Sequence, residues 1–481
     1  MGMDMTINRL PAPTWNWLHV NEVSLKGVSA PSKGRLTAET PASIHFYTEH
    51  INIEETVQPA GKSTASETGA DQGVETCNKT ADKTAEAEQL AQIATGLGAD
   101  MDELAKQGET SFDIWEIAPG VRESEPVRLH FTYEPGDTVQ NRIGIRLGAG
   151  SEMTVIMDYC TADLWSNGSL PADGSPSSGG ECVQGEPVSA KTAENNVTKK
   201  AEENAGRNTE SEEPEFSVPE ERNENAASTV PEKRIENAAS SVTEGQTDFS
   251  ASAYKSPEPA CRSLGAVQTK IRLGKGAHLR LVQIQKLPDE FTFLNDVGTD
   301  CAQGAKIETI QIVLGGGSTC MGMRTELGGR KSELESKIGY LLDNKESLDM
   351  NYLAYQTGAK TTSRMDVSGV LRGSSKKLFR GTIDFRNGAV GAKGDEKEDV
   401  LLLSDGVENR TVPLILCEEE DVEGNHGATI GRLDESLLFY LSSRGIEENE
   451  IYEMMARARI DALCADIQDE KTRCLVQRCM G

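Results

Sequence analysis

One histidine lies in a setting that permits metal chemistry. His426 is flanked by small residues, with Gly424 and Asn425 before it and Gly427 and Ala428 after it. These neighbours leave the imidazole uncrowded, and neutral imidazole is a good ligand for iron. The same pattern also fits a structural histidine that bonds a backbone carbonyl where a strand turns into a helix. The residues alone leave both interpretations open.

The cysteines offer no ready-made metal site. There are ten of them, none forms a C-x-x-C motif, and no pair has histidines at zinc spacing or matches an iron–sulfur binding motif. Cys417 is close to His426 in the sequence, and we expect it to be a small buried hydrophobic residue. If this chain handles iron and sulfur, the site must therefore be assembled from distant residues or shared with a partner.

Two glycine-rich segments resemble fragments of a phosphate-binding loop. They read LGGGSTC at 314–320 and LGGRKS at 327–332, and neither has the complete G-x-x-x-x-G-K-[ST] spacing. Both fall between predicted strands, whereas a phosphate-binding loop joins a strand to a helix. We expect them to be ordinary turns and expect this chain to bind no nucleotide. No Ser–His–Asp set or paired acidic motif is present at a useful spacing.

The spacing of apolar residues changes around His426, from the alternation of a strand to the three- and four-residue steps of a helix. Residues 412–416 alternate apolar and polar as a strand does, whereas the leucines of 437–441 recur at helical spacing. Asp434 is a good N-cap for that helix, and Gly445 is a typical C-terminal stop. His426 is therefore predicted to lie in a turn between a strand and a helix.

The rest of the chain is mostly β. Alternating segments separated by Gly, Pro, Asn and Asp turns predict a β core over 111–160 and 257–433. Such short, evenly spaced strands fit a solenoid, a sandwich or a barrel, and periodicity alone does not separate these folds. Residues 1–110 form a mixed segment with a polar linker at 55–84 and two short helices over 86–108. Residues 161–256 are acidic and of low complexity, which predicts a disordered insertion, and residues 434–481 form a helical domain.

Composition restricts the partners. The formal net charge is −28, which disfavours nucleic acid and anionic membranes, since both require clustered Lys and Arg. No apolar run approaches membrane-spanning length, and the N-terminus does not look like a signal peptide. These features predict a cytoplasmic protein that meets other proteins.

Two segments near the C-terminus resemble a known family. Residues 421–431 read DVEGNHGATIG and residues 437–446 read LLFYLSSRGI. Together they resemble the C-terminal signature of the SufB/SufD family, the scaffolds of the Suf iron–sulfur cluster assembly system. Weaker similarity extends through 9–21, 268–285, 367–385 and 401–406. The resemblance implies a right-handed parallel β-helix with an N-terminal α/β segment and a small C-terminal helical domain.

The resemblance also implies a site and partners. It places His426 at the interface with a SufB-type subunit, where a transient iron–sulfur cluster shared between the subunits is assembled. It further implies that a SufC-type ABC ATPase binds the C-terminal helices, with Leu438, Phe439 and Tyr440 as candidate contacts. Packing of these three residues onto the last β coil is the equally acceptable alternative.

Departures from the family pattern favour one branch. An ungapped alignment on His426 places Glu398 where the SufB branch has its sulfur-accepting cysteine, and a carboxylate cannot act as a thiolate. Many SufD proteins have a cysteine at the position of Gly424. The chain therefore resembles a non-catalytic SufD-like scaffold, with ATP hydrolysed by the SufC-type partner. The alternatives are a self-associating scaffold that forms a homodimer without SufB, a plain β-helix interaction module, and a secreted β-helix enzyme acting on polysaccharide.

Overall fold

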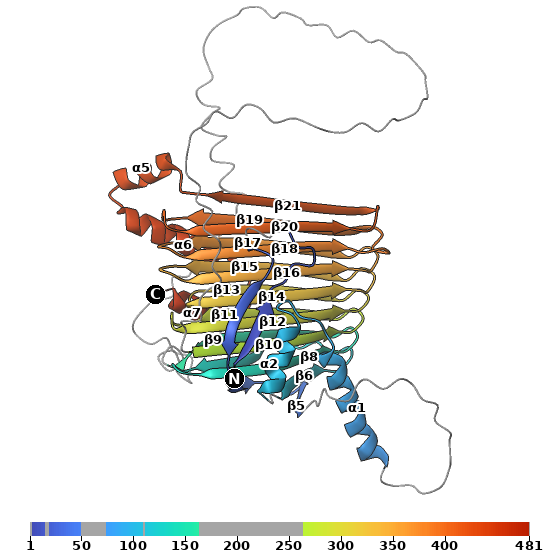
Figure 1. The fold of residues 1–481 in the computed structure, drawn as a ribbon. Coiled ribbons are helices and arrows are strands. Elements are labelled where there is room, and N and C mark those ends of the chain that lie inside the picture. Colours follow the sequence, from blue (N-terminus) through green and yellow to red (C-terminus); the bar gives the residue numbers. More distant parts are fainter. Residues whose placement is uncertain (1, 15–18, 50–73, 109–110, 163–262, 481) are drawn as a thin grey trace, which may run out of the picture. The chain divides into compact units, whose positions relative to one another are not determined.

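The computed structural model describes residues 2–14, 19–49, 74–108, 111–162 and 263–480, with backbone only for 74–82 (Figure 1). Within these residues the chain winds into a parallel β-solenoid, so the expected β-helix is confirmed. The insertion expected at 161–256 lies almost entirely outside the described residues. The linker expected at 55–84 is only partly described, and its last part is helical, because α1 spans Val74–Ala91.

Two sheets form the solenoid, and successive strands alternate between them. Sheet I contains, from one end to the other, β20 (Glu408–Cys417), β18 (Lys376–Phe385), β16 (Ser347–Gln356), β14 (Ser318–Leu327), β12 (Phe291–Cys301), β10 (Ser263–Leu273), β8 (Thr138–Leu147), β6 (Phe112–Ile117) and β5 (Ile44–Glu49), with β3 (Ser32–Lys33) beside β8. Sheet II contains β21 (Val422–Gly431), β19 (Ala392–Leu402), β17 (Thr362–Leu371), β15 (Glu333–Leu342), β13 (Lys306–Val313), β11 (His278–Lys286), β9 (Glu152–Thr161), β7 (Val127–Tyr133) and β4 (Arg35–Glu39).

Neighbouring coils stack in register. Each strand from β6 to β21 pairs in parallel with the strand two positions along the chain, so side chains on one face form columns that cross the coils. β10 pairs with both β8 and β12 without any shift, although the long segment 163–262 precedes it. The interior is filled mainly by Val, Ile, Leu, Met and aromatic side chains that alternate along each strand. This alternation is the signal that predicted the strands.

The corners of the coils are also stacked. At one corner a residue with positive φ recurs, and its backbone N–H donates to a carbonyl in the following coil, as from Gly276 to Gln303 at 2.8 Å. Glycine reaches this left-handed conformation without steric cost, which explains the glycine-rich turns. The glycine-rich segments at 314–320 and 327–332 lead into β14 and β15, so they are turns between strands as predicted. The corner residues are Gly150, Gly276, Gly304, Lys331, Lys360 and Gly391.

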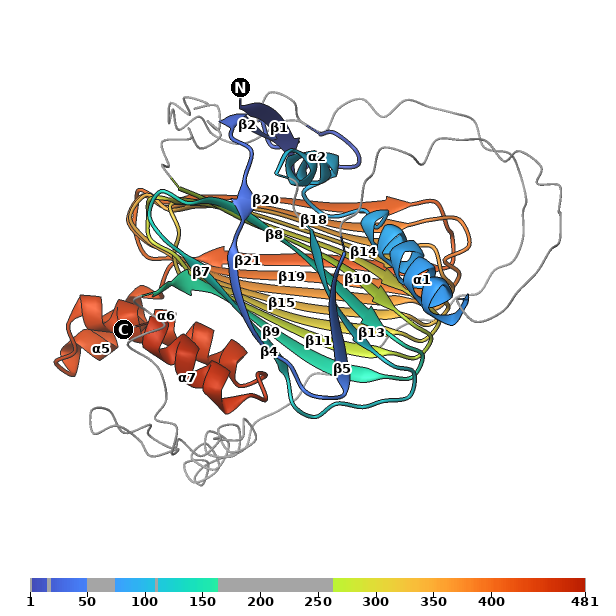
Figure 2. The same cartoon turned by 90° about the horizontal axis from the view of Figure 1, so that it is seen from below.

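Peripheral elements cover the outer faces of the two sheets (Figure 2). The hairpin β1 (Met3–Ile7)–β2 (Val23–Val28) and α2 (Ala99–Gln107) pack on sheet I, where Met5 and Leu104 meet Leu294. α6 (Glu448–Cys464) and α7 (Glu470–Cys479) pack on sheet II, where Ile460 and Val476 are fully buried. No helix among the described residues is long and apolar enough to cross a membrane.

Candidate functional site

His426 lies in the middle of the last strand, β21, and not in a turn before a helix as the sequence suggested. The small residues around it are strand residues whose in-register partners lie in β19. The prediction was wrong because Gly and Asn disfavour strands locally, whereas pairing along the whole length of β19 overrides that preference. The helix that follows, α5 (Glu435–Ser443), has the predicted N-cap, since the Asp434 carboxylate accepts the Ser436 and Leu437 N–H groups.

The His426 side chain belongs to the set that faces the interior of the solenoid. A Cβ on Gly424 would lie 3.0 Å from the Phe385 ring and 3.2 Å from Ile415, so Gly424 faces inward. Side chains two positions apart on a strand share a face, and His426 therefore faces inward as well. It is nevertheless exposed, because no described strand lies beyond β21.

Glu396 occupies the inward-facing position directly beneath His426. The two residues are paired in register across β19 and β21, which puts their backbones about 4.8 Å apart. Glu396 is only 4% exposed, and it makes no hydrogen bond or ion pair with any described residue. Burial, and next the charge of Glu398, raises the pKa of its carboxyl group to about 8.

Gly381 provides the space for this carboxyl group. It lies on β18, and a Cβ there would be 2.2 Å from Oε2 and 2.6 Å from Oε1 of Glu396. Any residue other than glycine at position 381 would therefore displace the carboxyl group.

A second inward-facing carboxylate, Glu398, is fully paired. Lys377 donates a hydrogen bond to it, and the Thr411 hydroxyl donates to its Oε2 at 2.6 Å. Lys377 and Glu398 are both almost completely buried, and burial lowers the pKa of the lysine. Glu398 is thus an interior ion-pair partner, which leaves Glu396 as the inward carboxylate near His426 without a bonding partner.

Cys417 is exposed, so the expectation that it is buried was wrong. It ends β20, paired with Phe385, while the part of sheet I opposite Glu396 is Gly381 and its partner Pro413. Four strand residues, about 13 Å, separate Pro413 from Cys417. The structure therefore does not bring Cys417 and His426 to one site.

The two ends of the solenoid differ. At one end the terminal strands are the short β4 and β5, which run antiparallel to their neighbours, and Ile44 of β5 and Trp115 of the adjacent β6 are buried. At the other end, β20 and β21 each present ten residues, and no described element pairs with their outer edges. Ile430, an inward-facing residue of β21, is 46% exposed there. We call this second end, comprising β20 and β21, the open end.

α5 is largely exposed. It buries none of its residues, Phe439 is 76% exposed, Tyr440 is 53% exposed and Leu438 is half-buried. Two of the three candidate contact residues thus face solvent instead of packing onto the last coil. A solvent-exposed helix this rich in apolar side chains is typical of a docking surface.

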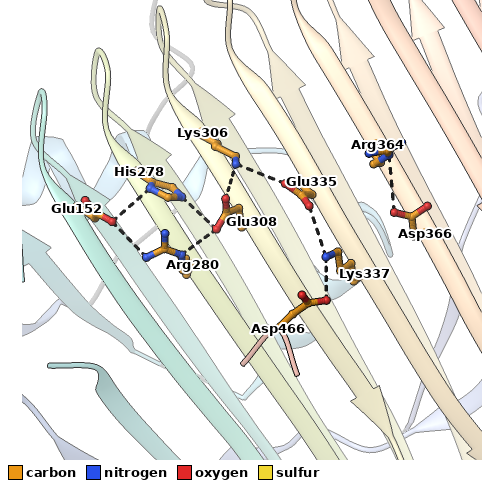
Figure 3. A network of polar contacts seen from close by, with 10 residues as sticks. All are labelled: Glu152, His278, Arg280, Lys306, Glu308, Glu335, Lys337, Arg364, Asp366 and Asp466. Atoms are coloured by element: carbon orange, nitrogen blue, oxygen red, sulfur yellow. Dashed lines mark hydrogen bonds and ion pairs between the residues drawn. The ribbon is translucent and has the colours of Figure 1, made fainter. Parts of the chain in front are cut away.

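The outer face of sheet II carries a ladder of charges that sequence reasoning missed (Figure 3). His278 and Arg280 each bridge Glu152 and Glu308, and the chain of contacts continues to Asp466 beside α6. The contact with His278, whose Nε2 lies 3.3 Å from Oε2 of Glu308, lowers the pKa of Glu308. A groove of about 290 Å³ runs along this ladder, but the charges lining it are already paired. The ladder comprises Glu152, His278, Arg280, Lys306, Glu308, Glu335, Lys337 and Asp466, with Arg364 and Asp366 as a separate pair.

The part of the chain that the structure describes contains no group of three His, Cys, Asp or Glu residues placed to hold a metal ion. The site at the open end can therefore supply an imidazole and a carboxyl group, and further ligands must come from elsewhere.

Residues 231–459 match the family model described as SUF system FeS cluster assembly, SufBD core domain. A chloroplastic SufBD-family iron–sulfur cluster assembly protein of Arabidopsis thaliana is 26% identical over 220 residues, 44% of this chain and 39% of that protein. The iron–sulfur cluster assembly protein SufD of Bacillus subtilis is 27% identical over 159 residues, 33% of this chain and 36% of that protein. SufD of Escherichia coli is 27% identical over 170 residues, 35% and 40% of the two chains.

The chain belongs to the SufB/SufD family. Its matches span less than half the length of each of these three relatives. His426 lies within the matched residues, on an exposed strand at the open end of the solenoid.

Sequence reasoning found His426 but missed Glu396, Gly381 and Lys377. Glu396 precedes His426 by 30 residues, which is one coil, and that spacing was the available signal. The signal is weak, because the positive-φ corners at 276, 304, 331, 360 and 391 show that coil length varies.

Proposed function

We propose that this chain is a SufD-like, non-catalytic scaffold of iron–sulfur cluster assembly that works in the cytoplasm. In this proposal it pairs with a SufB-type subunit through the open end and binds a SufC-type ATPase through α5. The nascent cluster is cargo built between the subunits, and ATP is hydrolysed by the ATPase partner.

The observation that carries the proposal is the open end with His426 on it. Two ten-residue strand edges without described partners favour addition of strands from another subunit, since unpaired N–H and C=O groups template such pairing. His426 would then lie in the interface between the two subunits. Because a metal ion or cluster needs more ligands than the open end offers, a site shared between subunits is the arrangement that fits.

The SufD-like assignment is supported by Glu398. The position where the SufB branch has its cysteine holds a carboxylate buried against Lys377 and Thr411. Without a thiol there, the sulfur acceptor has to be supplied by the partner. The exposed Phe439 and Tyr440 support the second contact, because aromatic side chains are frequent anchors of protein interfaces.

The test is co-expression with a SufB-type and a SufC-type subunit from the same genome, anaerobic purification, and measurement of the mass in solution. We expect one complex containing all three proteins, with iron and sulfide that are lost in His426→Ala. Asn425→Ala, next to it on the outer face of β21, is the matched control and should keep both.

Other masses would decide between the alternatives. A homodimer that carries iron and sulfide without partners would favour the self-associating scaffold. A monomer that binds neither partner would contradict the proposed function, but it would not affect the family assignment or the fold.

A further inference from the structure

We propose that Glu396 and His426 form half of a binding site for ferrous iron at the open end of the solenoid. The inference deepens the proposed function and depends on it only for the partner that would complete the coordination. It assigns a role to Glu396, which neither its sequence context nor the family resemblance singled out.

The first support is position. The two residues face the same way on adjacent, in-register strands, so both side chains project into the interior of the solenoid, one coil apart. A backbone separation of about 4.8 Å lets an imidazole nitrogen and a carboxylate oxygen reach one ion at about 2.1 Å each. His426 lies at the rim, where it is exposed, and Glu396 lies one strand deeper.

The second support is the state of the Glu396 carboxyl group. Buried acidic groups in folded proteins are normally hydrogen-bonded or ion-paired, because an unpaired one loses its hydration without compensation. Glu398, two residues away on the same face, follows this rule through Lys377 and Thr411. Glu396 has no such partner among the described residues, so its carboxyl oxygens stay available to an ion.

The third support is space. Gly381 leaves a recess on β18 that the Glu396 carboxyl group fills, so the group is held in the interior against β18. An alanine there would push it away. The recess lies on β18, the carboxyl group comes from β19 and the imidazole from β21, so three different strands contribute to this end of the interior.

The donor set selects the class of ion. A histidine nitrogen combined with a carboxylate oxygen, with other positions open, suits first-row divalent metals and is the pattern used by non-haem Fe(II) sites. Thiol or sulfide ligands from a partner could fill the remaining positions.

The experiment is titration of the full-length chain alone with Co²⁺, a redox-stable substitute for Fe²⁺, followed by calorimetry and visible absorption. Wild type should show a site that is absent from His426→Ala. Loss of partners that merely orient ligands costs 10- to 100-fold in metal affinity, so Glu396→Gln should weaken this site at least about tenfold. The double variant should bind no more weakly than His426→Ala, since both residues serve one ion.

Two further variants separate the site from general effects. Glu423→Gln removes an exposed carboxylate on the outer face of β21, where it pairs with Lys393, and should leave the affinity unchanged. Gly381→Ala keeps both ligands but displaces the carboxyl group, and it should weaken binding as Glu396→Gln does. Circular dichroism and melting temperature check that each variant is folded.

The inference is overturned if Glu396→Gln binds Co²⁺ as wild type does, or if wild type binds no more tightly than His426→Ala. These outcomes are independent of complex formation. A chain that binds Co²⁺ through both residues yet forms no complex would retain the half-site and contradict the proposed function. If the complex forms but Glu396→Gln binds Co²⁺ with full affinity, the proposed function stands and the half-site is contradicted.

Discussion

At the scale of single residues, three buried carboxyl groups show how burial and bonding combine. Burial raises the pKa of Asp296 and Glu346 to about 7 and that of Glu396 to about 8. Asp296 accepts hydrogen bonds from the Leu97 N–H and from Gln268, and Glu346 accepts one from the Asp343 N–H. These hydrogen bonds give Asp296 and Glu346 structural roles, whereas Glu396 makes no hydrogen bond with any described residue.

Asp296 makes stability depend on pH. Its folded-state pKa lies above the unfolded value of about 4, so the folded state holds a proton that the unfolded state releases. The free energy of unfolding therefore falls as pH rises from about 4 to about 7, by up to about 1.4 kcal/mol per pH unit. Asp296→Asn should remove this fall, because the amide oxygen still accepts the Leu97 N–H and does not titrate.

The measurement is urea unfolding of wild type and Asp296→Asn at pH 5 and pH 8. The variant should gain stability relative to wild type between the two pH values. Asp300→Asn, a partly exposed carboxylate on the same strand that pairs with Arg272, is the control and should show a nearly constant difference. If the difference in the free energy of unfolding between Asp296→Asn and wild type were the same at pH 5 and pH 8, the raised pKa of Asp296 would be contradicted.

Residues of the site were predictable only where a local pattern marks them. His426 was recognisable from its small neighbours, and Asp434 from the helix that it caps. Glu396 was not, because its significance depends on which residue stacks above it. Cys417 was misjudged for a related reason, since an apolar strand at the open end has no further coil to bury it.

At the scale of elements, alternation and turn residues predicted the strands well, and their pairing less well. Hydrophobic periodicity is local, so it reports which face of a strand is buried. The register between strands depends on the number of residues in each corner. Because the left-handed corner residues are a mixture of Gly and Lys, the corners cannot be located from the sequence by one residue type. The charged ladder of Figure 3 was invisible for the same reason, because its members are joined only once the coils are in register.

α5 carries a prediction of its own. Phe439→Asp should leave the free energy of unfolding within about 0.5 kcal/mol of wild type, because the residue packs against nothing that it would uncover. If α5 binds the ATPase, the same change should weaken that contact at least about tenfold, as loss of an aromatic anchor does. Binding to the SufC-type subunit is measured by calorimetry, with Ser442→Asp on the same helix as the charge-matched control. A large loss of stability would instead show that Phe439 is buried in solution.

At the scale of the whole solenoid, the difference between its two ends predicts which end pairs with another subunit. Ile430→Lys places a charge among the inward-facing side chains of the open end, and a lysine on an edge strand opposes strand addition. We expect this variant to fold and to bind the SufC-type subunit, but to lose the SufB-type subunit in sedimentation of the co-expressed proteins. Phe46→Lys likewise replaces an exposed apolar residue by lysine, on β5 at the opposite end, and should leave the complex intact. If Phe46→Lys abolished binding of the SufB-type subunit and Ile430→Lys did not, the interface would lie at the opposite end from His426. A cluster site shared between subunits at the open end would then be contradicted.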